Sequence, residues 1–228
     1  MLRSRLLAGS AVTLVVLLGS ATGTASAQEE DPCAAPPPGA IVGTDGNDVL
    51  RGTDGPDLIV AGDGNDVVFA GAGDDLICGG LGDDQIHAGD GDDTVAADDL
   101  SFFGNVNAPG GDDRVRGGAG DDEILAGPGD DNVDGGAGDD FLALAVGNDR
   151  GRGGSGSDTV IGGFGADQLL GQPGEDVLIG GPGSDLLNGG PGNDALFGFL
   201  PPDGFDRCIG ASGTDFALDC EAVHAVEA

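Results

Sequence analysis

An aspartate recurs at every ninth residue through most of this chain, and this spacing restricts the possible folds more than any other feature. Each aspartate stands two places after a glycine and two places before a residue that is nearly always aliphatic. A hard divalent cation such as Ca²⁺ takes several oxygen ligands, which carboxylates and loop carbonyls provide. We therefore interpret the series as a ladder of candidate calcium sites. Its members are Asp48, Asp57, Asp66, Asp75, Asp84, Asp93, Asp113, Asp122, Asp131, Asp140, Asp149, Asp158, Asp167, Asp176, Asp185 and Asp194, with Asp206 and Asp215 as less regular additions.

The repeating unit is the nonapeptide G-G-x-G-x-D-x-U-x, in which U is apolar, and eighteen copies can be aligned. The fourth place is always glycine, which indicates a backbone conformation or a close approach that a side chain would forbid. The eighth place is Leu, Ile or Val in all copies but three, which have Gly151, Cys208 and Ala217. Turns followed by such short strands are stable only when copies stack. We expect an all-β rod in which two nonapeptides complete one coil around a narrow core.

This unit resembles the hemolysin-type calcium-binding repeat of RTX proteins, and the resemblance extends over about residues 43–218. It implies a parallel β-roll, a right-handed β-helix-like solenoid of tandem nonapeptide repeats, here without an effector domain. It also implies that aspartates two repeats apart share an ion, Asp48 with Asp66 and Asp57 with Asp75. The unbroken blocks would then hold at most about a dozen Ca²⁺ ions.

Calcium would also relieve the repulsion within the ladder. Neighbouring carboxylates at the strand spacing of about 4.8 Å repel by roughly 3.5 kcal/mol at an effective dielectric constant of about 20. We therefore predict that folding is coupled to calcium binding.

The pattern divides the chain into segments. The first combines Arg3 and Arg5, an apolar stretch and a small-residue cleavage site, as is typical of a secretory signal peptide. Where the motif lapses we expect the coil to be broken or bulged. At Gly151 we expect weak packing, because the coil loses roughly 1.5 to 3 kcal/mol of buried aliphatic surface. The predicted segments are the signal peptide (1–27), a proline-rich lead segment (28–42), a first repeat block (43–96), an interruption (97–107), a second repeat block (108–197) and the C-terminal repeats with a disulfide-closed cap (198–228).

The charge restricts the partners. The formal net charge is −33, and all eight basic residues are arginines. Since phosphate binding needs a basic surface, we exclude nucleic acid, and no segment is long enough to insert into a membrane. We expect a secreted, extracellular protein whose partners are calcium ions. The sequence does not identify a protein or polysaccharide partner.

Four cysteines in a secreted chain favour two disulfides. Three connectivities are possible. Proximity along the chain favours Cys208–Cys220, which leaves Cys33–Cys78 to tie the lead segment to an early repeat. A zinc site is disfavoured, because the chain has no C-x-x-C pair and only His87 and His224 could assist.

Two classes of function fit these features. One is a stand-alone secreted calcium-binding protein, and the other is an extracellular adhesion or surface-recognition rod that calcium stiffens. An enzyme is a distant third, since the sequence has no H-E-x-x-H motif, no G-x-S-x-G elbow and no phosphate loop. A recognition face should repeat one chemistry along an outer row, and the ninth places present none, which favours the first class. These ninth places read Arg51, Val60, Phe69, Cys78, His87, Ala96, Arg116, Leu125 and Asp134.

Overall fold

The structure is a computed structural model that describes residues 32–98, 110–199, 205–220 and 222–225. The predicted signal peptide and most of the predicted interruption lie outside these residues. The chain divides into two compact units, residues 1–38 and 39–228, and every described strand belongs to the second. In the described ranges, no helix has the length and apolar character needed to cross a membrane.

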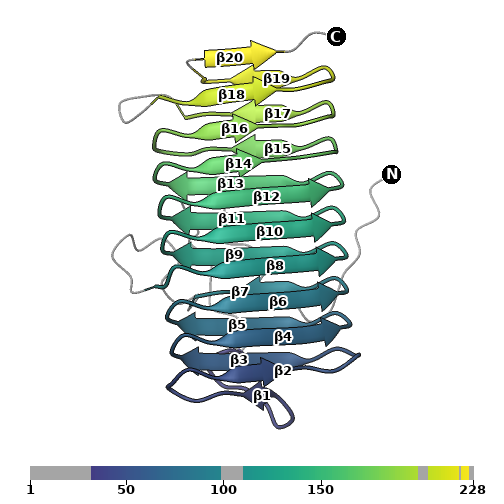
Figure 1. Ribbon diagram of the computed structural model, residues 1–228, viewed down its shortest axis with the longest axis vertical. Coiled ribbons are helices and arrows are strands. Elements are labelled where there is room, and N and C mark those ends of the chain that lie inside the picture. The colour runs from purple at the N-terminus through teal and green to yellow at the C-terminus, as the bar shows by residue number, and fades with distance from the viewer. Residues whose placement is uncertain (1–31, 99–109, 200–204, 221, 226–228) are drawn as a thin grey trace, which may run out of the picture. The chain divides into compact units, whose positions relative to one another are not determined.

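The strands of the second unit alternate between two parallel sheets of ten strands each, as Figure 1 shows. The odd sheet contains β1 (Ile41–Val42), β3 (Leu58–Asp63), β5 (Leu76–Leu81), β7 (Thr94–Ala96), β9 (Glu123–Pro128), β11 (Phe141–Val146), β13 (Thr159–Phe164), β15 (Val177–Ile179), β17 (Ala195–Phe197) and β19 (Phe216–Leu218). The even sheet contains β2 (Val49–Arg51), β4 (Val67–Ala72), β6 (Gln85–Asp90), β8 (Arg114–Ala119), β10 (Asn132–Ala137), β12 (Arg150–Ser155), β14 (Gln168–Leu170), β16 (Leu186–Asn188), β18 (Arg207–Gly210) and β20 (Ala222–Ala225). This all-β parallel solenoid with two nonapeptides per coil confirms the predicted β-roll.

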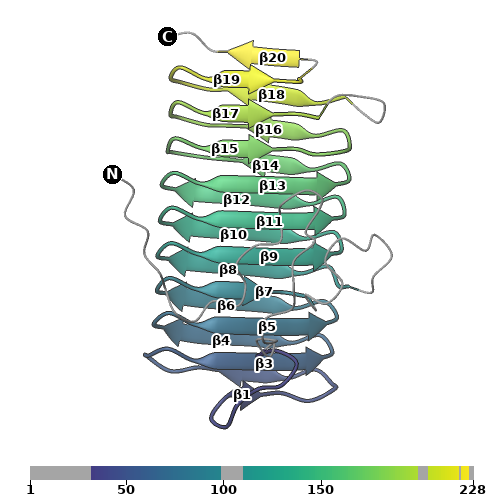
Figure 2. The ribbon, with the colours of Figure 1, turned by 180° about the vertical axis from the view of Figure 1, so that it is seen from behind.

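The register places equivalent repeat positions on top of one another. Val68 pairs with Ile86 in the next coil, eighteen residues further along the chain. The same sheet then pairs Ile86 with Val115 across the interruption, and the odd sheet likewise pairs Val95 with Ile124. Figure 2 shows the strands concerned, β7 and β9, as neighbours. The stacking is therefore not broken here, and the predicted bulge falls on residues of which most lie outside the described ranges. The extra residues leave the stacking intact, because the motif resumes with its inward and outward positions unchanged.

The core consists of the eighth-place side chains of both sheets, as predicted. Ile59, Val68, Ile77 and Leu142 are fully buried, as are most of their equivalents along both sheets, whereas Leu50 and Ala217 near the two ends are partly buried. Because the two sheets face each other across one layer of such side chains, every coil contributes two of them. The fold needs no large aromatic residue inside.

Most described fourth-place glycines have the left-handed conformation or the close approach that the sequence indicates, whereas Gly46 and Gly55 in the first two repeats have neither. Gly82 has φ = 121°, and a Cβ there would collide with the backbone of Gly64 in the preceding coil. At the second place two residues other than glycine adopt the same left-handed backbone, Ala145 with φ = 81° and Gln172 with φ = 77°. Such conformations are costly for residues with a side chain.

Packing at Gly151 is not weak, contrary to the prediction. Gly151 is buried on β12, and the first place of the same repeat carries Leu144, which is fully buried. The Cδ1 atom of Leu144 lies 3.0 Å from the point where a Cβ of Gly151 would stand. The leucine therefore fills the space that the missing side chain leaves.

The polarity of the ninth-place side chains differs between the two sheets, and this is not apparent when they are read in chain order. On the odd strands they are all apolar, although four of them, Cys78, Ala96, Leu125 and Ala143, are buried and so present no outer surface. On the even strands they are mixed. The odd row contains Val42, Val60, Cys78, Ala96, Leu125, Ala143, Ile161, Ile179, Phe197 and Leu218.

Candidate metal centre

Each ladder aspartate directly precedes a strand, so the carboxylates line the points where the turns enter the two sheets. Asp48, Asp57 and Asp215 are partly exposed. All the others are at most 2% exposed, although no lysine or arginine side chain lies among the repeated turn positions. These buried members are Asp66, Asp75, Asp84, Asp93, Asp113, Asp122, Asp131, Asp140, Asp149, Asp158, Asp167, Asp176, Asp185, Asp194 and Asp206.

One oxygen of each carboxylate is held by the coil before it. The backbone N–H of Asp48 donates to Oδ1 of Asp66 at 2.7 Å, and that of Asp57 donates to Oδ1 of Asp75 at 2.8 Å. The same bond recurs along the chain, including across the interruption, where Asp84 donates to Asp113 at 2.8 Å. The structure thus brings together the predicted pairs, and it extends the ladder beyond the unbroken blocks.

The second oxygen has no partner in most of the ladder. Leaving a buried polar atom unpaired costs roughly 1 to 3 kcal/mol, and more when the group is charged. Such a carboxylate needs a proton or a cation. The buried Oδ2 atoms without a hydrogen bond belong to Asp66, Asp75, Asp84, Asp93, Asp113, Asp122, Asp131, Asp140, Asp149, Asp158, Asp167, Asp176, Asp185 and Asp194.

Backbone carbonyls lie close to these oxygens because the first place of the repeat is often glycine. A Cβ on Gly162 would collide with Oδ2 of Asp167 and would lie 2.7 Å from the carbonyl oxygen of Gly180. Two oxygens therefore face the same point. Among the described residues no three His, Cys, Asp or Glu side chains gather into a metal-binding group. A cation in this ladder would need carbonyl oxygens beside the carboxylates, which is the ligand chemistry that Ca²⁺ accepts.

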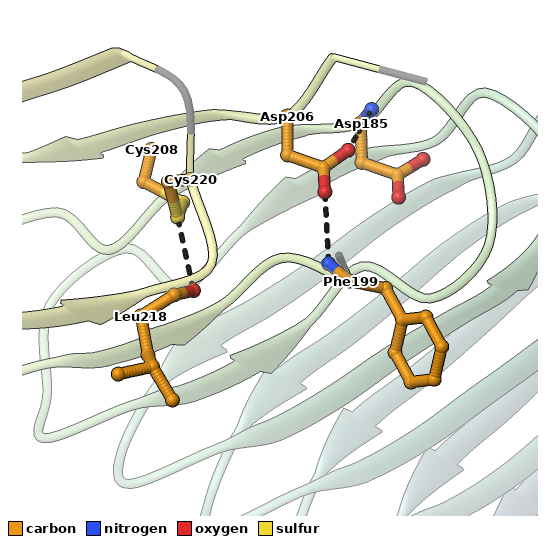
Figure 3. The surroundings of a disulfide bond; sticks show 6 residues. All are labelled: Asp185, Phe199, Asp206, Cys208, Leu218 and Cys220. Carbon is orange, nitrogen blue, oxygen red and sulfur yellow. Dashed lines mark hydrogen bonds between the residues drawn. A yellow bond between two sulfur atoms is a disulfide. The ribbon is translucent and has the colours of Figure 1, made fainter. Parts of the chain in front are cut away.

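The ends of the ladder are satisfied by the protein itself. At the N-terminal end the second place is threonine, and Thr44 donates its backbone N–H at 2.7 Å and its hydroxyl at 2.8 Å to Oδ2 of Asp48. Thr53 does the same for Asp57 at 2.6 and 2.9 Å. Near the C-terminal end the N–H of Phe199 donates to Oδ2 of Asp206 at 2.8 Å, as Figure 3 shows.

Burial raises the pKa values of the interior carboxyl groups. The pKa of Asp113 rises to about 9 because of burial, with further increases from the charges of Asp131, Asp98 and Asp84. Burial likewise raises the pKa of Asp149 to about 8. In each case the hydrogen bond from the preceding coil opposes the shift. Ionised carboxylates are therefore unfavourable in this ladder without a compensating charge.

The sequence analysis did not single out a second, exposed ladder at the fifth place. Oδ1 of Asp121 accepts the backbone N–H of Asp139 at 2.8 Å, and Oδ1 of Asp130 accepts that of Asn148 at 2.8 Å. Recurrent Asp-Asp dipeptides were the available signal. This ladder stabilises the turns from outside and adds negative charge beside the buried carboxylates.

The structure contains the predicted Cys208–Cys220 disulfide, with Cα atoms 5.9 Å apart (Figure 3). Cys208 occupies an eighth place and is fully buried, so it serves the core as well as the crosslink. Cys33 and Cys78 are also disulfide-bonded. His87 is half-buried and stacks on Phe69 at 5.0 Å between ring centroids.

Comparison with known families agrees with this geometry. The sequence model described as RTX calcium-binding nonapeptide repeat matches residues 42–77, 76–99, 110–142, 146–178 and 170–198, which together make up more than half of the chain. A search of curated proteins gave no match.

Proposed function

Because the chain belongs to the family of RTX calcium-binding nonapeptide repeat proteins, we propose that it is a secreted protein that holds several Ca²⁺ ions along its aspartate ladder and folds with them. The family supports calcium binding, and the signal-peptide pattern of residues 1–27 supports secretion. The proposed ligands are the sixth-place aspartates of stacked repeats together with turn carbonyls. The proposal assigns no catalytic role to the chain.

The buried Oδ2 atoms carry this proposal. Asp167 illustrates the arrangement: its Oδ1 accepts the N–H of Asp149, whereas its Oδ2 is buried without a partner beside the open position of Gly162. When bound, Ca²⁺ would supply the positively charged partner that this oxygen lacks. The residues present fit the ion because they offer oxygen ligands only. The two N-terminal members, Asp48 and Asp57, depend on it least, since threonines already satisfy their Oδ2 atoms.

The adhesion or recognition rod remains the alternative. The apolar ninth places of the odd sheet give it partial support, since those outside the buried stretch from Cys78 to Ala143 share one chemistry. Calcium would then stiffen a scaffold whose outer faces meet a partner.

A calcium titration of the chain from residue 28, with its disulfides intact, tests the proposal. Far-UV circular dichroism follows folding, and equilibrium dialysis counts the bound ions. We expect a cooperative rise in β signal as several Ca²⁺ ions bind, with no comparable rise in Mg²⁺, which tolerates irregular coordination poorly. A chain that is fully folded in chelator, or that binds one or two ions, would contradict the proposal.

Paired variants locate the ions. Asp167→Asn keeps the shape of a buried ladder residue but removes its charge, and we expect at least one ion fewer and a higher calcium midpoint. Asp63→Asn makes the same charge change at the exposed last residue of β3. Its stoichiometry should equal that of the wild type. Equal losses in both variants would mean that calcium responds to overall charge and not to the ladder.

A further inference from the structure

The arginines of the roll gather on one sheet. The described part of the chain contains six, and all of them lie on even strands: Arg51 on β2, Arg114 and Arg116 on β8, Arg150 and Arg152 on β12, and Arg207 on β18. They occupy seventh and ninth places, which face outward. In a chain with 41 acidic residues, this segregation gives the even sheet an outer face unlike the rest of the surface.

Four of these arginines form a compact group around β10. Asn132 pairs with Arg114 on one side and with Arg150 on the other, and Asp134 likewise pairs with Arg116 and Arg152. Strands that are two apart in a sheet are separated by about 9.6 Å, and alternate residues along a strand by about 6.6 Å. The group is therefore a rectangle of cationic side chains with an amide and one carboxylate along its midline.

The surface over this group is hollowed. A hollow of about 120 Å³ is lined by Gln85, His87, Arg116, Asn132 and Asp134, together with Arg114 and Arg152. A second hollow shares Asp134 and Arg152 and continues to Leu170 and Gln172. Together they form a shallow track across the even strands from β6 to β14.

Planar side chains extend the ninth-place row beyond the first hollow. Phe69 stacks on His87 with an angle of 4° between the rings, and the guanidinium of Arg51 lies 4.6 Å from the centroid of the Phe69 ring. Contacts of this kind order otherwise mobile side chains. The track is therefore preorganised at its N-terminal side.

We propose that this face binds a linear acidic polysaccharide, with the Arg114, Arg116, Arg150 and Arg152 guanidinium groups on its carboxylates. Guanidinium groups bind carboxylates through paired N–H donors. The interspersed Gln85, Asn132 and Asp134 side chains supply the donors and acceptors that sugar hydroxyls require. A chain with one carboxylate in each disaccharide would place successive charges on successive arginine pairs along the sheet.

A protein partner and duplex DNA fit this face less well than a polysaccharide. A protein interface of normal affinity has aromatic or aliphatic anchors at its centre, whereas the seventh and ninth places of β6, β8, β10 and β12 carry only polar and charged side chains. Duplex DNA carries about one charge per 1.7 Å of its axis, so the surrounding acidic turns would repel it more strongly than a sparsely charged glycan.

Binding to a hyaluronan octasaccharide, which has one carboxylate in each disaccharide, tests the proposal. The full chain from residue 28 is titrated in calcium by calorimetry, with the carboxyl-reduced octasaccharide as the neutral ligand control. We expect binding of the acidic form and at least about tenfold weaker binding of the reduced form, because charge-assisted hydrogen bonds are lost. No binding of the acidic form, or equal binding of both forms, would overturn the proposal.

A matched pair of variants tests the position of the site. Arg116→Gln with Arg152→Gln removes two charges from the track, and we expect at least about a tenfold loss of affinity. Arg207→Glu changes the charge of the same sheet by the same two units at an exposed position outside both hollows, and should change affinity less than about threefold. Equal losses would indicate diffuse attraction and refute the site.

Two further measurements separate this proposal from its competitors. Circular dichroism of the same samples distinguishes an unfolded roll, which would contradict the calcium proposal, from a folded roll that does not bind. Sedimentation of the chain alone shows whether it self-associates. If the chain self-associates and the double variant Arg116→Gln with Arg152→Gln abolishes this self-association, the face binds a second copy of the chain. That result would refute the polysaccharide proposal. Equally tight binding of a short DNA duplex would do so as well.

Discussion

Leu144 and Gly151 exchange the usual roles of the first and eighth places within one repeat. Elsewhere the described first places are glycine or alanine, and the eighth places carry the larger side chain. Here the buried Leu144 reaches under Gly151, whose Cβ would lie 3.0 Å from Leu144 Cδ1 and 2.7 Å from Val160 Cγ1. The two positions should therefore be energetically coupled.

The magnitudes follow from this geometry. Leu144→Ala empties a fully buried site and should cost roughly 2 to 5 kcal/mol. Gly151→Val alone overfills the core and should cost about 1 to 3 kcal/mol. The double variant recreates the combination of Ala126 and Val133 one coil earlier, where both residues are fully buried. It should lie within about 1.5 kcal/mol of the wild type, which implies a favourable coupling of at least about 1.5 kcal/mol.

Urea denaturation followed by circular dichroism measures all four proteins of this cycle. Calcium must be saturating and identical throughout, because bound ions contribute to the free energy of unfolding. Additive losses, with the double variant the least stable of the four, would refute the argument. They would mean that the space beneath Gly151 is not the space that Leu144 fills.

Two other changes test the turns. Burial raises the pKa of Asp113 to about 9 and that of Asp84 to about 7, above the value of about 3.9 for an unfolded chain. The stability that these groups contribute to the metal-free roll is therefore fully present below about pH 4 and is lost as the pH rises through about 7 to 9. In chelator, the β signal in circular dichroism should be larger at pH 5.5 than at pH 9. The reverse order would contradict the shifts in pKa. Gln172→Gly removes a side chain from a left-handed backbone. The folded state gains about 1 to 2 kcal/mol from the relief of strain and loses about 0.5 to 1 kcal/mol to the added entropy of the unfolded chain, so the melting temperature should rise. The control Gln168→Gly, in β14, should lower the melting temperature.

Much of the fold is predictable because one spacing fixes it. The nine-residue period determines the strands, the glycine turns and the inward eighth places, and the structure confirms each. What the period does not predict are the compensations at departures from the repeat. Leu144 fills the space beside Gly151 from the first place of the same repeat, where the consensus has glycine and predicts no core side chain. The sheets continue across the interruption because register depends on where the motif resumes and not on how many residues intervene.

The outer faces were missed for a related reason. Successive repeats belong to opposite sheets, so a row on one face consists of every second ninth place. Reading Arg51, Val60, Phe69 and Cys78 in order mixes two faces, whereas sorting by sheet separates an apolar row from an arginine-bearing one. The sequence alone contains this information once the coil is known to hold two repeats.

The distribution of hydrogen-bond donors separates the ends of the roll from its interior. At the first two rungs threonine supplies two donors to the second carboxylate oxygen, and at Asp206 the backbone of Phe199 supplies one. Between these ends the second place is mostly glycine with a left-handed backbone, as at Gly62 and Gly163, and the oxygen is buried unpaired. Burying an ionised carboxylate oxygen without a partner costs more free energy than burying a neutral polar group without one. Under the proposed function, the ends would therefore persist without metal, and the interior coils would be the part of the roll that calcium completes.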